Sequence, residues 1–235
     1  MFKMVSNNSL PHPYYPRDIS LPHYVPNDKD VGVLLGGFLG VLFTFIAGVW
    51  IYSGRSTKPT FSLFERVRLC WFVMCGIIHT FLEGYLSIFH ATIAGEMTFL
   101  AQIWKEYSKS DSRYLTSDTF VICMESLTAA VVGPLAFLAL AAFLWNSSYR
   151  YIIQLTLSIC QLYGVVLYFM TEIKEDFPHS DHTDPMYFWL YFVLMNTLYI
   201  AVPLLLIVQA AMNLAQTQSS SDRSLKQTKS GKKRR

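Results

Sequence analysis

The sequence predicts an all-α polytopic membrane protein, a bundle of five transmembrane helices. Of its 235 residues 52% are hydrophobic and only 15% are charged, and the mean hydropathy is +0.31. Such a chain is too apolar for an ordinary soluble domain of this size. The apolar residues form five stretches, each close to the roughly 20 helical residues that cross a bilayer. We therefore expect one compact membrane domain.

The first two spans are predicted at Val31–Tyr52 and Val67–Phe89, where long apolar runs are bounded by polar residues. The first span contains Gly36, Gly37 and Gly40. Small residues let membrane helices approach closely. This face therefore either contacts another helix or is simply a flexible stretch of small residues.

Three further spans are predicted at Phe120–Trp145, Tyr151–Met170 and Met186–Met212. The short connection NSSYR between the third and fourth spans implies a tight antiparallel hairpin. Pro134 and Pro203 fall inside spans. Neighbouring helices can satisfy the carbonyl groups that a proline frees, so we expect kinks rather than breaks.

The spans divide the chain into three parts. Residues 1–30 are polar and proline-rich, without the pattern of a cleavable signal peptide. Residues 31–213 form the five-helix domain, and the Ser/Lys-rich residues 214–235 are predicted to be disordered.

The connection over residues 97–118 has its own character, since it is too polar to span a membrane and too aromatic for a plain linker. We expect an amphipathic segment lying in the membrane interface. Its aromatic residues Trp104, Tyr107 and Tyr114 would then face lipid or the mouth of a cavity.

Loop charges predict the orientation. Basic residues gather in the first and third connections and in the tail, which the positive-inside rule places in the cytosol. Five spans then place the N-terminus in the lumen. The final residues Lys232, Lys233, Arg234 and Arg235 match a dilysine signal for retrieval to the endoplasmic reticulum. They equally fit a basic tether to anionic lipid.

Polar residues inside the spans are the strongest functional signal. Glu83 and Glu125 lie in otherwise apolar runs, with His79 one helical turn before the first and Thr128 three residues after the second. Asn196 interrupts the fifth span. A lone polar residue such as Asn196 is best explained by helix packing. Two intramembrane acids with a histidine indicate function, because burying them is costly.

The chemistry of these groups suggests proton transfer. A histidine and a glutamate one turn apart can share a proton, and a second carboxyl group nearby favours one protonated and one ionised acid. Such a set fits the movement of a proton between two carbons of a lipid-soluble molecule. Gln154 and Gln161 are interpreted as structural.

Other chemistries lack their signatures. The sequence has no phosphate loop, dinucleotide fingerprint, nucleophile elbow or metal-binding array, so we expect no cofactor, no metal and no nucleic-acid partner. Four cysteines, all in predicted spans, lack metal or redox spacing. Two further functions remain open: a non-catalytic membrane receptor for sterols or cationic amphiphilic amines, and a transporter or proton channel, which internal symmetry would favour.

Several motifs resemble one known family. The stretches CGIIHTFLEG, QIWKEYSKSDSRY, ICMESLTA and YFWLYFVLMN are similar to the emopamil-binding proteins of the EXPERA superfamily. The resemblance implies a five-helix fold in the endoplasmic reticulum membrane, a homodimer, and isomerisation of sterols from Δ8 to Δ7 in cholesterol biosynthesis. It also implies binding of cationic amphiphilic drugs, which mimic a sterol carbocation.

The resemblance also assigns the site. It implies catalytic roles for His79, Glu83, Glu125, Thr128 and Asn196. It further implies a cavity lined by the three aromatic residues of the 97–118 segment.

The chain departs from the family at two positions. Tyr199 stands where the family has tryptophan, and Val165 where it has an acidic residue. Tyr199 is expected to face the cation with a smaller aromatic ring. In the expected reaction one group protonates C9, a cation forms at C8, and another group removes a proton from C7.

Overall fold

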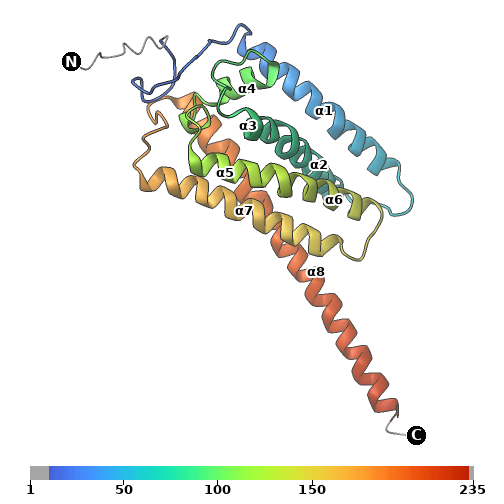
Figure 1. Cartoon of the computed structure of the whole chain (residues 1–235). Helices are drawn as coiled ribbons and strands as arrows, with labels where there is room; N and C mark the ends of the chain where they lie inside the picture. Colours follow the sequence, from blue (N-terminus) through green and yellow to red (C-terminus); the bar gives the residue numbers. More distant parts are fainter. Residues whose placement is uncertain (1–10, 233–235) are drawn as a thin grey trace, which may run out of the picture.

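The structure is a computed structural model that describes residues 11–232, with side chains to residue 227. Throughout those residues it consists of helices and connecting loops, without a strand (Figure 1). Five segments are long and apolar enough to cross a membrane: Val31–Arg55, Leu63–Phe89, Thr119–Leu144, Arg150–Lys174 and Pro185–Gln227. Each overlaps one predicted span, so the all-α five-span prediction is confirmed.

Three of the spans combine α-helix with π-helix, in which hydrogen bonds join residues five apart. The first and fourth spans are the single helices α1 (Val31–Arg55) and α7 (Arg150–Lys174). The others are composite: α2 (Leu63–Ile77), η1 (Ile78–Glu83) and α3 (Gly84–Phe89); α5 (Thr119–Leu127), η3 (Thr128–Val132) and α6 (Gly133–Leu144); η4 (Pro185–Leu194) and α8 (Met195–Lys232).

Several of these helices begin at capping side chains, because the first turn leaves backbone N–H groups without helical partners. Ser62 and Glu65 form a reciprocal capping box at the start of α2. Asp118 accepts a hydrogen bond from the backbone N–H of Val121 at 2.9 Å. Asp184 accepts two backbone N–H groups at the start of η4.

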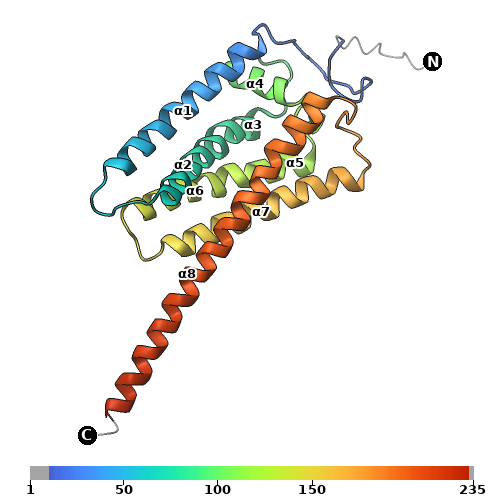
Figure 2. The same ribbon diagram turned by 180° about the vertical axis from the view of Figure 1, so that it is seen from behind.

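The spans lie side by side in a tilted bundle. α1 forms one edge and packs on α2; α2 packs on α6, α6 on α7, and α7 on α8 (Figure 1). Seen from behind, α8 lies along α7 and then leaves the bundle (Figure 2). The two ends of the described chain therefore lie at opposite ends of the bundle.

Helix α4 (Phe99–Tyr107) and the 3-10 turn η2 (Ser112–Tyr114) form the connection predicted as interfacial. The structure differs from that prediction, because residues 101–106 are all buried. The chain before α1 covers the helix: Asn27 donates to the backbone carbonyl of Gln102 at 2.8 Å, and Lys105 Nζ to that of Val25 at 2.8 Å. Sequence polarity suggested a solvent-facing side that residues 11–30 in fact cover.

The C-terminal part also differs from the sequence prediction. α8 continues to Lys232, whereas composition predicted disorder over 214–235. The described side chains from Ala215 to Gln227 are all exposed. Hydrogen bonds within the helix hold this part, among them the one from the Gln218 side chain to Asp222 at 2.9 Å, and residues 233–235 lie outside the described chain.

The bundle has two main apolar cores, one toward each end. The core near α4 is rich in aromatic residues, among them Trp104, Tyr114 and Phe192. The core at the opposite end gathers around Phe72, Leu157 and Phe143. The buried acids lie between them.

Candidate active site

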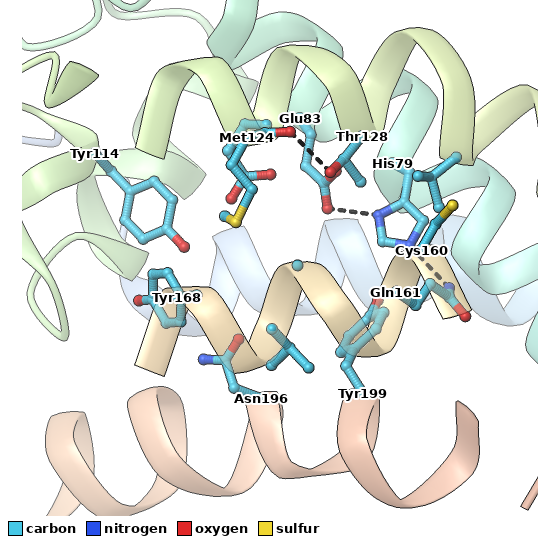
Figure 3. A pocket seen from close by; sticks show the side chains of 14 residues that line it. His79, Glu83, Tyr114, Met124, Thr128, Cys160, Gln161, Tyr168, Asn196 and Tyr199 are labelled. Carbon is cyan, nitrogen blue, oxygen red and sulfur yellow. Dashed lines mark hydrogen bonds and ion pairs between the residues drawn. The ribbon is translucent and has the colours of Figure 1, made fainter. Parts of the chain in front are cut away.

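A pocket inside the bundle brings together residues from four spans and from η2 (Figure 3). The space not filled by atoms in this region is about 500 Å³, the open solvent at its mouth included. Five of the expected site residues line it together with Tyr199 and Tyr114. The full lining is His79, Glu83, Tyr114, Met124, Glu125, Thr128, Val132, Cys160, Gln161, Gly164, Val165, Tyr168, Asn196 and Tyr199.

The ionisable side chains lie in or close to π-helical turns. His79 and Glu83 belong to η1, and Glu125 lies in the last turn of α5, three residues before η3 begins. Their exposed fractions are 4%, 8% and 6%. A π-turn inserts one residue into a helix and so rotates the residues around it, which is why such turns occur often at functional sites. The predicted convergence of the two acids and the histidine is what the structure has.

The histidine and the first acid form a direct pair, with His79 Nδ1 2.7 Å from Glu83 Oε1. Glu125 is the adjacent acid and interacts electrostatically with Glu83. Neighbouring carboxyl groups disfavour each other's ionised form. Burial raises the pKa of Tyr114 well above its usual value, so Tyr114 stays a neutral hydroxyl within hydrogen-bonding reach of Glu125.

The two uncharged candidates line the pocket but do not bond to an acid. Thr128 Oγ1 donates to the backbone carbonyl of Met124 at 2.9 Å. Asn196 Nδ2 donates to the carbonyl of Phe192 at 2.7 Å and to the hydroxyl of Tyr107 at 3.3 Å. Asn196 therefore ties α8 to α4, a contact that its position in a span did not predict.

The expected aromatic residues divide into two groups. Tyr114 and Tyr199 line the pocket, and the Tyr199 ring lies 5.5 Å from the His79 ring. Trp104 lies behind Tyr114, with ring centroids 4.9 Å apart, and its indole N–H is taken by the Leu82 carbonyl at 2.8 Å. Trp104 thus supports the wall rather than facing the pocket.

Tyr107 also belongs to this second group. Its ring packs on Tyr114 at 5.4 Å, and burial raises its pKa above the usual value. The neutral hydroxyl accepts the Asn196 hydrogen bond and contributes to the outer wall of the site.

Helix α7 supplies five of the lining residues, among them Gln161 and Val165. Gln161 was interpreted as structural, but its Nε2 lies 3.1 Å from His79 Nε2. Val165 lines the same wall. Gln161 and Val165 are four residues apart and so share a helix face. The sequence did contain a sign of this. Gln161 is a polar residue in an apolar span, and Val165, one helical turn later, is a position where the chain departs from the family. Together they mark the side of α7 that faces the pocket.

The spans that carry the acids cross at a glycine. A Cβ atom placed on Gly133 would meet the backbone of Thr80, 2.9 Å from its nitrogen, and the Thr80 hydroxyl oxygen. Only glycine allows the two backbones to come this close. Gly133 therefore lets η3 and η1 pack together, which brings Glu125 beside Glu83.

A buried ionic network supports the pocket wall from outside. Arg113 Nη2 donates to Asp111 Oδ2 at 2.6 Å, and the Tyr168 hydroxyl donates to the same oxygen at 2.6 Å. Arg113 also lies 3.4 Å from Glu172, which bonds His179 Nδ1 at 3.0 Å. Because Tyr168 lines the pocket, the network fixes one of its walls.

Metal-binding residues are not grouped in the described chain: within residues 11–232, no three His, Cys, Asp or Glu side chains gather to hold an ion. The four cysteines are free thiols. Whether the protein uses a metal or a cofactor stays a prediction of the sequence.

Comparison with known proteins agrees with this geometry. Residues 99–210 match the family model EBP, described as EXPERA (EXPanded EBP superfamily). The chain is 40% identical to the 3-beta-hydroxysteroid-Delta(8),Delta(7)-isomerase of Rattus norvegicus over 96% of this chain and 99% of that protein. It is 37% identical to a probable isomerase of that name from Arabidopsis thaliana, over 84% and 86%.

A relative with a different named activity shares the same region. The isomeliandiol synthase of Melia azedarach is 39% identical over 72% of this chain and 78% of its own length. The family thus includes proteins named for different products. With two-fifths of its residues shared over almost its whole length with the rat protein, this chain belongs to the EXPERA superfamily, among the relatives of the sterol Δ8,Δ7-isomerases.

Proposed function

We propose that this protein moves a sterol double bond from Δ8 to Δ7 by proton transfer within the His79, Glu83 and Glu125 pocket. The relatives named as Δ8,Δ7-isomerases support the reaction. The observation that carries the chemistry is the convergence of one imidazole and two carboxyl groups from two spans in one buried pocket. The reaction is an isomerisation of a carbon–carbon double bond and consumes no second substrate.

The proposed reaction has two steps. An acid of the pocket gives a proton to C9. The electron pair of the Δ8 double bond forms the new C9–H bond, and C8 becomes a tertiary cation. A base of the pocket then takes the proton from C7, and the C7–H electron pair becomes the Δ7 double bond. The adjacency of His79–Glu83 to Glu125 supports this division, because one group can hold the proton while another is free to accept one.

The remaining residues shape the site for the cation. The rings of Tyr114 and Tyr199 offer electron-rich faces near the acids. Asn196 ties α8, which carries Tyr199, to α4, while the Thr128 hydroxyl bonds to the Met124 carbonyl within its own span, one turn from Glu125. A water-excluding pocket is required, since water would trap the cation as an alcohol.

The same charge arrangement suits a second class of ligand. Cationic amphiphilic amines place a fixed positive charge where the sterol cation would form, next to buried carboxyl groups and aromatic rings. We expect such amines to compete with the sterol. Binding of the amine to a protein without isomerase activity would instead favour the receptor function.

The cellular setting is part of the proposal. The basic connections and tail support a cytosolic C-terminus and a lumenal N-terminal segment, and sterol chemistry with a basic tail supports the endoplasmic reticulum membrane. The exposed face of α1 presents Gly36, Gly40 and Thr44, a small-residue ridge that fits a homodimer. Protease protection of tagged termini and mass photometry in detergent test orientation and dimer.

The test of the chemistry is Glu125→Gln, which keeps size but removes titration. Purified in detergent, this variant should lose turnover of a Δ8 sterol by at least about a hundredfold, with thermal stability close to the parent. Glu175→Gln makes the same change at an exposed acid and should retain full turnover. Wild-type rates in Glu125→Gln would reject the acid–base assignment.

A further inference from the structure

Both ring nitrogens of His79 have partners, and the partners come from different spans. Nδ1 lies 2.7 Å from Glu83 Oε1 on the same span, and Nε2 lies 3.1 Å from Gln161 Nε2 on α7 (Figure 3). The histidine and Gln161 are buried, with exposed fractions of 4% and 6%. The protonation state of His79 is therefore tied to both contacts.

The contact with Gln161 specifies where the ring hydrogen lies. The amide NH₂ group is a donor only, so the Nε2 atom that it faces must carry the lone pair. A neutral imidazole then has its hydrogen on Nδ1 and donates it to Glu83 Oε1. In this arrangement Glu83 is the acceptor and the His79–Glu83 pair is ready to take up a proton.

When the pair gains a proton, the requirement at Nε2 reverses. If the added proton is on His79, the imidazolium donates from both nitrogens. If it is on Glu83, the neutral ring accepts at Nδ1 and carries its own hydrogen on Nε2. Either state needs an acceptor at Nε2. A half-turn of the Gln161 amide places Oε1 where Nε2 was and supplies one.

The surroundings of Gln161 permit this half-turn. Its Oε1 is buried without a hydrogen-bond partner among the described residues, so only the contact of Nε2 with His79 orients the amide. Gln154 on the same helix also has a buried Oε1 without a partner, but its Nε2 donates to the Leu206 carbonyl at 2.8 Å and to Gln209 at 3.0 Å, so a half-turn would break two hydrogen bonds. Of these two buried glutamines, Gln161 is the one that can turn.

We propose that Gln161 is a positioning residue that sets the tautomer of His79 and reverses its amide when the His79–Glu83 pair takes up a proton. The inference rests on the proposed function, because it assumes that this pair loads and unloads a proton in each cycle. Gln161 thereby keeps Nε2 hydrogen-bonded in both states, so that neither state leaves a buried polar atom of the ring unpaired.

The kinetic test is Gln161→Met, which keeps the length of the side chain and removes both the NH₂ group and the carbonyl oxygen of its amide. Loss of one hydrogen bond to a group that becomes charged predicts a fall in kcat of about 10- to 100-fold, with KM within about threefold of the parent. The matched control Gln154→Met removes a buried amide outside the pocket. It should lower thermal stability and leave kcat within about threefold.

A spectroscopic test needs no turnover. In protein with ¹⁵N-labelled histidine, the signals of His79 are assigned among the six histidines by their loss in His79→Gln. In the resting protein the neutral ring should carry its hydrogen on Nδ1 and a hydrogen-bonded lone pair on Nε2. In Gln161→Met the Nε2 signal should move to the position of a lone pair without a donor, whereas Gln154→Met should leave it unchanged.

Three results would overturn the inference: a resting His79 protonated on Nε2, an unchanged His79 spectrum in Gln161→Met, or wild-type kcat in that variant. If Gln161→Met does not fold, the spectrum of the parent protein still decides the tautomer. A parent protein that shows the Nδ1–H tautomer but converts no Δ8 sterol would instead refute the proposed function alone.

Discussion

Replacing Gly133 with alanine tests how closely the two spans that carry the acids must pack. The added Cβ would lie 2.9 Å from the Thr80 nitrogen and 3.2 Å from its Cα, whereas ordinary contacts begin at 3.4 Å. The backbones must therefore separate by about 0.5 Å. Because Thr80 follows His79 directly, the separation displaces the histidine from the pocket geometry.

The magnitude follows from two opposing effects. Overpacking against backbone costs about 1–3 kcal/mol, and the better helix propensity of alanine over glycine returns about 1 kcal/mol. Gly84→Ala is the matched control, since it gains the same propensity while its new Cβ meets Ala129 at an ordinary 3.8 Å. The difference between the two variants isolates the clash at about 1–3 kcal/mol, which predicts a Tm about 3–10 °C lower for Gly133→Ala.

The assay combines thermal unfolding in detergent with initial rates on a Δ8 sterol. A displacement of 1 Å in a catalytic group can cost a hundredfold in rate, so about 0.5 Å predicts a loss of about tenfold for Gly133→Ala. Gly84→Ala should stay within about threefold of the parent. Equal Tm and equal rates in the two variants would refute the close-crossing argument.

Three further predictions concern the walls of the pocket. The hydrogen bond that the His179 ring donates to Glu172 raises the pKa of His179, which also lies near Asp111 and Arg113. The stabilisation from this pair is therefore present below about pH 6.5 and is lost as the pH rises through the folded-state pKa of His179. Tm should fall between about pH 6 and pH 9, and this slope should flatten in His179→Gln. Arg113→Met leaves the Asp111 carboxylate buried without its cation. The substitution should lower the free energy of unfolding by about 3–5 kcal/mol, measured by urea unfolding. A loss below about 1 kcal/mol would contradict the role of the network. Tyr199→Phe removes a buried hydroxyl that has no partner among the described residues and keeps the ring, so turnover should stay within about threefold of the parent. Tyr199→Leu removes the ring and should lower turnover further. Equal rates in the two variants would exclude a role for the aromatic face.

The spans and the buried acids could be predicted from the sequence because they depend on local chemistry. A run of about 20 apolar residues is recognisable without knowledge of its neighbours, and all five spans were found in this way. Glu83 and Glu125 stood out because a carboxyl group is costly in lipid wherever it points. His79 was singled out with them because it lies one helical turn from Glu83, and family resemblance added catalytic roles for Thr128 and Asn196.

Contacts between helices could not be predicted in the same way. Composition predicted an amphipathic interfacial segment at 97–118, with its aromatic residues facing lipid or a cavity mouth, but it did not predict that residues 11–30 would cover α4. Trp104 was expected in the cavity and instead supports its wall through a hydrogen bond to the Leu82 carbonyl. Hydropathy assigns a residue to the membrane region but does not say which neighbour will cover it.

Sequence alone determined that this chain crosses the membrane five times and carries two acids and a histidine in its apolar spans. The tertiary structure alone decided that Gln161 contacts His79 and that Gly133 lets the acid-bearing spans meet. The reason is rotational. A π-turn inserts a residue and rotates the helix beyond it, so which side chains face one another depends on packing between spans that are distant in the sequence.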